Sequence, residues 1–290
     1  MKVVAFAPGH ISGFFEPIYQ NQNADKSGSR GAGINITLGA TSQVSVKNST
    51  SQIIDISINN KKTDATVTKL AIKYLIRDTP IHITVDTTLA LPTGQGFGMS
   101  GAGALSCTTA LAKRLQIPTV DALKASHYAE IALHTGLGDV LASSFGGIEI
   151  RREAGLPPWG MIEHIPGKYD VVVCIIGNQI DTKKILSDPV KINEIASYGR
   201  YCIKKILEKP SIENLFSLSQ TFTKKTGLAD KKVIDAIDVA NHHGMASMCM
   251  LGNSVFAVGN TDMLATSLST YGKVYVCSVD QGGARVLDID

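Results

Sequence analysis

The sequence predicts an α+β protein with two lobes, and three observations support this fold class. Apolar or alternating segments typical of strands occur in both halves of the chain, and segments with helical periodicity lie between them. The stretch GLPPWGMIEHIPGK, residues 155–168, is rich in Pro and Gly and separates the two halves. The length of 290 residues also favours two domains. We therefore expect an N-terminal domain over residues 1–157 and a C-terminal domain over residues 158–290.

In the N-terminal half, strand patterns lie on both sides of a glycine-rich stretch that leads into two helices. The second helix has Thr119 as a candidate N-cap and Gly136 as a candidate stop. The expected elements are strands over 3–7, 42–47, 53–58 and 81–88, helices over 100–115 and 119–134, and a strand over 146–151.

The C-terminal half begins with the apolar run VVVCII, which has the pattern of a buried strand. Ser211 and Asp230 are candidate N-caps for the second and third of three helices that follow. The expected elements are a strand over 171–176, a helix over 191–208, the two capped helices, a strand–glycine turn–strand unit over 247–259, a helix over 262–270 and a strand over 274–279.

The composition argues against nucleic acid and membrane partners. The formal net charge is only +3, and the basic residues are scattered in pairs that are typical of solvated surface. No window approaches the roughly 18 apolar residues of a membrane span. The five cysteines are far apart and sit mostly among apolar neighbours, which favours buried, reduced thiols. We expect a cytoplasmic protein.

The stretch LPTGQGFGMSGAGAL, residues 91–105, has five glycines and leads into a helix, so its backbone N–H groups and the helix dipole favour an anion such as phosphate. Gly96 and Gly101 have the spacing of a P-loop, but Ala102 occupies its lysine position, which excludes that motif. A dinucleotide fingerprint is also present, yet Asp121, at the expected distance, lies at a helix start and not at the end of a second strand. A glycine turn that only packs helix against strand is the remaining structural alternative.

The segment LPTGQGFGMSGA (91–102) resembles the phosphate-binding loop of the GHMP kinases, the superfamily of galactokinase, homoserine kinase and mevalonate kinase. Met99 replaces the first serine of that loop, and Gly101 follows the second. The resemblance implies that ATP phosphates bind at Pro92, Gly94, Gly96, Phe97, Gly98, Met99, Ser100, Gly101 and Ala102.

Two further motifs occur in the order that the superfamily has. APGHISGFFEP (7–17) resembles its N-terminal substrate motif, with His10 where relatives carry Lys or Arg, and SMCMLGNSVFAV (247–258) resembles its C-terminal glycine turn. The combination with SRGAGINI (29–36) and HTGLGDVLASSFGG (134–147) is similar to the archaeal members that phosphorylate pantoate on its 4-hydroxyl, a step towards coenzyme A. This resemblance implies a ribosomal-protein-like N-terminal lobe and a ferredoxin-like C-terminal lobe, with ATP and Mg²⁺ as cofactors.

The resemblance also assigns roles to the acidic and hydroxyl side chains. From the residues alone, Ser100 suits an N-cap or a metal ligand equally, and Glu130 on a helix would ordinarily be solvated. The family places Mg²⁺ on Ser100 and Glu130, and it places a catalytic aspartate at Asp139, which we expect on a tight loop. His10 is a candidate to stabilise the developing alkoxide, with a turn or a substrate contact as the alternative.

Pantoate carries a carboxylate, for which arginine is the best-matched side chain. Arg151, at the end of a predicted strand, is the first candidate and Arg30 the second. Ser29, Glu16 and His10 are expected to complete the substrate pocket.

Two alternatives remain open at this point. One is a GHMP kinase with another acceptor, of the homoserine or mevalonate type, and the other is a homologue that binds ligands without catalysis. Because relatives often form homodimers, a homodimer is a further expectation of the resemblance.

Overall fold

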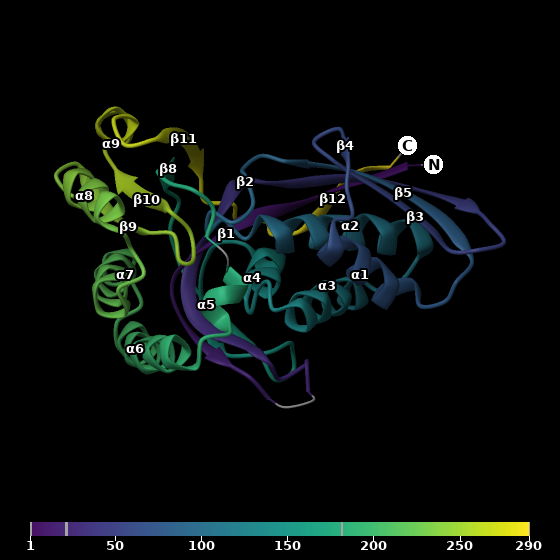
Figure 1. Cartoon of the computed structure of the whole chain (residues 1–290), viewed down its shortest axis with the longest axis horizontal. Coiled ribbons are helices and arrows are strands. Elements are labelled where there is room, and N and C mark those ends of the chain that lie inside the picture. The colour runs from purple at the N-terminus through teal and green to yellow at the C-terminus, as the bar shows by residue number, and fades with distance from the viewer. Residues whose placement is uncertain (1, 21–22, 181, 290) are drawn as a thin grey trace.

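The computed structural model describes residues 2–20, 23–180 and 182–289 and contains two β-sheets with helices packed against them (Figure 1). This arrangement confirms the predicted α+β fold with two lobes.

The larger sheet is built on two long antiparallel neighbours, β1 (Lys2–Ile18) and β2 (Gly28–Asn48). Its strand order is β12-β1-β2-β5-β3-β4, and β6 and β7 extend it from β2. Only β3 and β5 pair in parallel among the described strands. The remaining bounds are β3 (Ile53–Ile58), β4 (Lys61–Lys62), β5 (Ile81–Leu89), β6 (Ile148–Glu153), β7 (Met161–Ile165) and β12 (Arg285–Ile289).

β1 continues well beyond the strand over 3–7 that the sequence predicts. Pro8 and Gly9 interrupt the strand pattern, but the pairing with β2 shifts register between Ala7 and Gly9 and again between Ser12 and Phe14. Bulges of this kind accommodate a proline and turn neighbouring side chains in new directions. The residues between and beside the two bulges, including His10 and Ser12, are the ones that face the candidate site.

Helix α2 (Met99–Leu115) packs against β1 and β2 and is covered by α1 (Thr66–Ile76) and α3 (Thr119–Leu133). Every residue from Gly101 to Ala112 is buried, because the small side chains of this run let the neighbouring elements approach on all sides. The sequence did not predict α1, whose β-branched residues weaken the helical pattern. Pro118, and not Thr119, is the N-cap of α3, and its side chain makes no capping bond.

The second sheet is antiparallel, with the order β11-β8-β10-β9, which agrees with the expected ferredoxin-like lobe. Its strands are β8 (Asp170–Ile175), β9 (Gly244–Met248), β10 (Ser254–Gly259) and β11 (Lys273–Ser278). The helices of this half are α5 (Thr182–Leu186), α6 (Pro189–Glu208), α7 (Ile212–Thr226), α8 (Lys231–Ala240) and α9 (Thr261–Ser269). The predicted caps are confirmed, since Ser211 accepts from the Asn214 N–H and Asp230 from the Val233 N–H.

The two halves of the chain share strands and a core. α6 and α7 pack on β1, and one cluster of buried apolar side chains includes residues of both sheets. Two strands that follow residue 157, β7 and β12, pair within the larger sheet, and β12 brings the C-terminal end beside the N-terminal strand (Figure 1). The boundary at 157/158 stays a prediction, and these pairings favour assigning β7 and β12 to the first lobe.

The expectations about cysteines and about membrane spans can also be compared with the structure. All five cysteines are free and buried, as predicted. Among the described residues, no helix is both long and apolar enough to cross a membrane.

Candidate active site

A cleft opens where the two halves meet. Its walls come from β1, the start of α2, the segment between α3 and the helix α4 (Asp139–Phe145), and the turn between β9 and β10. Segments that are far apart in the sequence therefore meet around one space. This convergence is typical of a ligand site.

The glycine stretch forms one wall of this cleft. Gly94, Gly96 and Gly98 have φ angles of +69°, +78° and +60°, a conformation that favours glycine. A Cβ on Gly96 would stand 2.8 Å from the Cys249 carbonyl oxygen and 2.9 Å from that of Met250, so the β9–β10 turn leaves no room for a side chain. The predicted residues Gly94, Gly96, Phe97, Gly98, Met99 and Ser100 line the cleft.

The start of α2 gives this wall its positive character. The helix begins at Met99, its N-cap Gly98 is left-handed and provides no side-chain cap, and its first turn has no acidic residue. The first backbone N–H groups of a helix lack partners inside the helix, and the helix dipole adds partial positive charge there. Pro92, Gly101 and Ala102 do not line the cleft, because Pro92 is exposed and the other two are buried under the first turn.

Glu130 also lines the cleft and is 3% exposed. Gly101 and Gly136 make room for it, since a Cβ on Gly101 would stand 3.0 Å from Glu130 Oε2 and one on Gly136 would overlap it. Burial, and then the like charge of Asp139, raise the pKa of Glu130 well above its ordinary value. A buried carboxylate beside a second carboxylate, in a cleft that Ser100 also lines, suits a hard cation such as Mg²⁺.

Few protein oxygens are needed for such a site. Mg²⁺ usually keeps several waters, so one or two protein ligands suffice. Within the described ranges no group of three or more His, Cys, Asp or Glu side chains is placed to hold a metal. The donor set at this cleft therefore fits a cation held jointly with phosphates better than a closed all-protein metal site.

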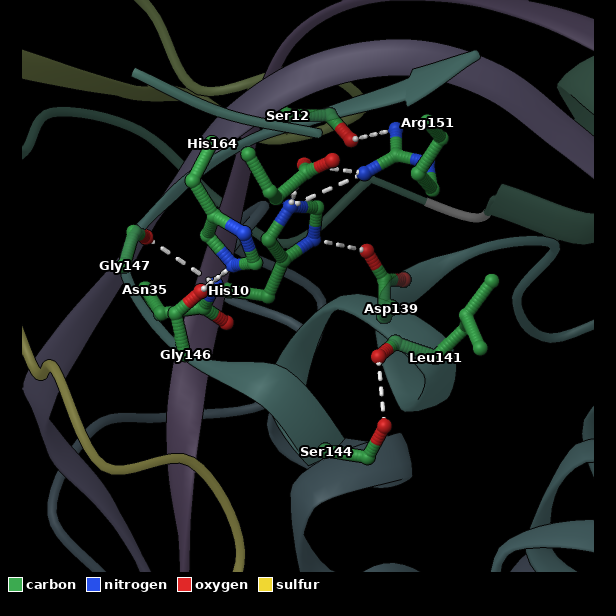
Figure 2. A network of polar contacts seen from close by, with 11 residues as sticks. His10, Ser12, Asn35, Asp139, Leu141, Ser144, Gly146, Gly147, Arg151 and His164 are labelled. Carbon is green, nitrogen blue, oxygen red and sulfur yellow. Dashed lines mark hydrogen bonds and ion pairs between the residues drawn. The ribbon is translucent and has the colours of Figure 1, made fainter. Parts of the chain in front are cut away.

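The sequence predicts Asp139 on a tight loop, but in the structure Asp139 is the first residue of α4. Gly138 precedes it as N-cap, and the short helix places the carboxylate beside the start of α2. Its side chain is 27% exposed, to the cleft that it lines. Asp139 Oδ1 lies 2.6 Å from His10 Nδ1 (Figure 2).

His10 connects Asp139 to a buried network on β6 (Figure 2). Its Nε2 lies 2.8 Å from Glu149 Oε1, which also accepts from the Arg151 guanidinium. Arg151 in turn donates to the Ser12 hydroxyl at 3.1 Å, and Ser12 lines the cleft. The network thus runs from the cleft at Asp139 through the protein and back to the cleft at Ser12.

The charges in this network shift the pKa of Asp139 in the direction opposite to that of Glu130. Burial alone would raise the pKa of Asp139, but the His10 hydrogen bond and the charges of His10 and Arg151 outweigh it and hold the pKa below its ordinary value. Burial has the opposite effect on a histidine and would lower the pKa of His10. Its contacts with Asp139 and Glu149 outweigh burial and raise that pKa. Asp139 is therefore ionised and oriented at the cleft wall.

The expected substrate residues occupy two different faces of the sheet. Ser29 lines the cleft, but the neighbouring Arg30 points to the other face, where it pairs with Glu16 at 3.3 Å. Glu16 also accepts from Arg200 on α6 at 2.9 Å, so neither Glu16 nor Arg30 reaches the cleft. Arg151 is fully buried behind the cleft wall. Its direct contact with a substrate stays a prediction, and in this structure its guanidinium faces Glu149 and Ser12.

Sequence reasoning missed four residues of these networks: Ser12, Thr135, Glu149 and Arg200. Two signals were available. Ser12 lies within the HISGFFEP motif, and Glu149 is two residues before Arg151 on a strand, which puts both side chains on one face. Thr135 lines the cleft with a buried hydroxyl that has no partner among the described residues.

Comparison with known proteins agrees with this geometry. The family model "GHMP kinases N terminal domain" matches residues 65–147. A curated pantoate kinase of Methanocaldococcus jannaschii is 32% identical over 94% of this chain and 99% of its own length. The chain belongs to the pantoate kinase family of GHMP kinases. A second pantoate kinase, of Thermococcus kodakarensis, is 31% identical over 89% of this chain and 88% of its own length.

Solved structures support the family and its fold. One described as a phosphotransferase related to the coenzyme A biosynthesis pathway superposes with a TM-score of 0.89 at 27% identity, and covers 99% of this chain and 98% of that one. A homoserine kinase from Cytophaga hutchinsonii has a TM-score of 0.71 at 17% identity over 99% of this chain and 97% of its own, which shows the shared fold. The family consists of ATP-dependent phosphotransferases with alcohol acceptors, so the expected enzyme class is confirmed.

Proposed function

We propose that this enzyme transfers the γ-phosphoryl group of ATP to the 4-hydroxyl of pantoate and forms 4-phosphopantoate for coenzyme A synthesis. The family supports the acceptor, because curated relatives that match nearly the whole chain are pantoate kinases. The single structural observation that carries the proposal is an ionised aspartate, Asp139, in the same cleft as the unpartnered start of α2.

The triphosphate is proposed to lie along the glycine wall, with its terminal phosphates at the first turn of α2. Backbone N–H groups there are fixed in place before the ligand arrives, so no reorganisation is needed when charge moves during transfer. Ser100 and Glu130 are proposed to hold Mg²⁺, which neutralises phosphate charge when it is bound.

Asp139 is proposed to accept the proton of the pantoate 4-hydroxyl. As the O–H bond breaks, its oxygen forms a bond to the γ-phosphorus, and the bond from that phosphorus to the bridging oxygen breaks to release ADP. His10 holds the carboxylate in place through the 2.6 Å contact and supplies positive charge beside the developing alkoxide.

The pantoate carboxylate is proposed to contact the hydroxyls of Ser12 and Ser29, which line the cleft. Arg151 contributes its charge from behind them, since it donates to the Ser12 hydroxyl. This arrangement replaces the direct arginine contact that the sequence suggests. It predicts that Arg151→Ala raises the KM for pantoate more than the KM for ATP, measured by steady-state kinetics. An unchanged KM for pantoate would remove Arg151 from substrate binding.

An acceptor panel tests the proposed function. ADP release is measured with pantoate, homoserine, mevalonate, shikimate and galactose in parallel, and the phosphorylated position is identified by NMR of the product. Turnover of pantoate with phosphate on its 4-hydroxyl supports the proposal. Turnover of another acceptor with none on pantoate would contradict it, and ATP binding without turnover of any acceptor would favour the non-catalytic homologue.

A further inference from the structure

Glu149 is a buried carboxylate to which the sequence and the family comparison assign no role. It lies on β6, is fully buried, and its Oε1 accepts from Arg151 and lies 2.8 Å from His10 Nε2. It is nevertheless not part of the cleft wall. Any effect that it has on catalysis must therefore act through His10 or Arg151.

Both ring nitrogens of His10 face carboxylates. Nδ1 lies 2.6 Å from Asp139 Oδ1 (Figure 2), and Nε2 lies 2.8 Å from Glu149 Oε1 and 3.1 Å from Arg151 Nη1. A carboxylate only accepts hydrogen bonds, and a neutral imidazole donates from one nitrogen only. Both carboxylate contacts are hydrogen bonds only when His10 carries two ring protons and a positive charge. A neutral ring would instead donate to Asp139 from Nδ1 and accept from Arg151 at Nε2, and it would leave Glu149 Oε1 without a donor on His10.

The charges of the network sum to zero when His10 carries two ring protons. Asp139 and Glu149 contribute two negative charges. Burial alone would raise the pKa of each, but the facing cations outweigh burial and hold both pKa values below the ordinary value. Arg151 supplies one positive charge, and a doubly protonated His10 supplies the second. The other titratable groups near this set are Glu130, which interacts with Asp139, and His164, which interacts with Glu149.

The backbone of β2 is shaped around the contact between His10 and Glu149. A Cβ on Gly33 would stand 2.7 Å from His10 Nε2 and 3.1 Å from Glu149 Oε1. A side chain at Gly33 would therefore push the two groups apart. Gly33 thus leaves room for this pair as well as for the β1 backbone, since its Cβ would also overlap the Ile11 carbonyl oxygen.

We propose that Glu149 is a positioning residue that keeps His10 permanently protonated, so that the histidine provides the fixed positive charge for which related kinases use Lys or Arg. The catalytic consequence rests on the proposed function, whereas the charge state of His10 does not. Without the Glu149 charge, only Asp139 would oppose burial and the nearby Arg151, which both lower the pKa of His10.

The first test measures the protons of His10 directly. The ligand-free enzyme, labelled with ¹⁵N in its histidine rings, is examined by NMR at neutral pH, and the His10 signals are assigned from their loss in His10→Asn. We expect a bonded proton on both nitrogens in the wild type and in Glu149→Asp, which keeps the charge. We expect a proton on only one in Glu149→Gln, which keeps the shape but not the charge.

The second test is the pH dependence of kcat. Activity that requires charged His10 is lost as pH rises through the pKa of that residue. Because Glu149→Gln lowers this pKa, the basic limb of the profile moves to lower pH, by about 1–3 units for the loss of a neighbouring opposite charge. The KM for ATP changes little. Glu163→Gln is the control, because Glu163 forms an exposed ion pair with Arg152 on the same two strands and leaves the limb in place.

The two tests separate this inference from the proposed function. Single protonation of His10 in the wild type, or double protonation that survives in Glu149→Gln, would overturn the inference whatever the acceptor. Double protonation in an enzyme that does not use pantoate would leave the inference standing and refute the acceptor. If Glu149→Gln does not fold, the wild-type spectrum alone still tests the charge of His10.

Discussion

At the scale of single residues, three carboxylates share one small region, and their surroundings shift their pKa values in different directions. Asp139 and Glu149 face His10 and Arg151, which hold their pKa values below the ordinary range. Glu130 interacts with another carboxylate, and its pKa is raised. Environments that separate the pKa values of neighbouring acids are characteristic of active sites. The separation supports a base role for Asp139 and a cation-binding role for Glu130.

Replacement of the proposed base gives the first prediction. Asp139→Asn keeps the shape of the side chain but cannot accept a proton, so we expect kcat to fall by about 10²–10⁴-fold, the usual contribution of general base catalysis. The KM for ATP should change little. Steady-state ADP release with pantoate measures both, and Asp238→Asn on α8, outside the cleft, is the control. Near wild-type kcat in Asp139→Asn would leave that aspartate a structural role only.

Replacement of the proposed cation ligand has a different signature. Glu130→Gln removes a charge that is buried beside Asp139, so we expect the Mg²⁺ concentration for half-maximal activity to rise. In EDTA the Tm should not fall, because a neutral amide costs less to bury than an unpaired carboxylate. Mg²⁺ titrations and thermal scans provide the two measurements. A lower Tm in EDTA with an unchanged Mg²⁺ requirement would assign Glu130 to the fold and not to the cation.

The residues that sequence reasoning placed correctly near one another are those that local pattern anchors. The glycine loop, Ser100, Glu130 and Asp139 meet at one cleft as the motif order implies. The burial of Arg151 and its pairing with Glu149 depend on which strand lies behind it, and this information is absent from the local sequence. Glu16 and Arg30 do not reach the cleft, because strand alternation turns them away from the face on which their neighbours Phe15 and Ser29 line it.

At the scale of elements, the start of α2 carries the phosphate site, and its glycines divide into two kinds. Gly96 is left-handed and closely covered by the β9–β10 turn, whereas a Cβ on Gly103, inside the helix, would meet Leu89 Cδ2 at an ordinary 3.6 Å. Position 96 cannot take a side chain unless the loop moves. Position 103 can take the methyl group of alanine without such a movement.

These two glycines give a matched pair of predictions. Gly96→Ala should raise the KM for ATP by about tenfold or more, because it displaces the loop that faces the phosphates. Gly103→Ala should leave kinetics unchanged and stabilise the protein by up to about 1 kcal/mol, since alanine favours the helix. Kinetics and denaturant unfolding measure the effects. Equal ATP affinity in the two variants would contradict a phosphate site in this loop.

Elements also differed in how well the sequence predicted them. Strong patterns gave α2, α3, β5 and the helices α6 to α9, and Ser211 and Asp230 marked helix starts correctly, whereas α5 was not predicted. The helix α1 and the long continuation of β1 were not predicted, because packing and strand pairing there override weak local preference. β12 is mostly exposed, so its sequence does not show the alternation of apolar and polar residues that marks a half-buried strand. Its position depends on pairing with β1.

At the scale of the whole molecule, the cleft exists because the two halves close on each other through backbone contacts. The Met250 N–H donates to the Ser12 carbonyl at 3.1 Å, and the Ile180 N–H donates to the Gly94 carbonyl at 3.0 Å. The β9–β10 turn therefore supports β1, and the segment between β8 and α5 supports the glycine loop. A change in the second lobe should therefore alter ATP binding at the glycine loop of the first lobe.

Gly252 tests this dependence between lobes. A Cβ on Gly252 would overlap the Gln95 carbonyl group, so Gly252→Ala should displace the loop and raise the KM for ATP by about tenfold to a hundredfold. Gly227→Ala is the control in the same lobe. That residue is left-handed but nothing lies within 4 Å of its Cβ position, so it should cost about 1–2 kcal/mol of stability without a change in KM. An unchanged KM in Gly252→Ala would uncouple the turn from ATP binding.

The most direct measurement of the whole account is a crystal structure of the complex with a non-hydrolysable ATP analogue, Mg²⁺ and pantoate. We expect the terminal phosphates at the backbone N–H groups of residues 96–101 and the pantoate 4-hydroxyl about 2.6–3.2 Å from an Asp139 carboxylate oxygen. Phosphates bound away from the start of α2, or a 4-hydroxyl beyond the reach of Asp139, would contradict it.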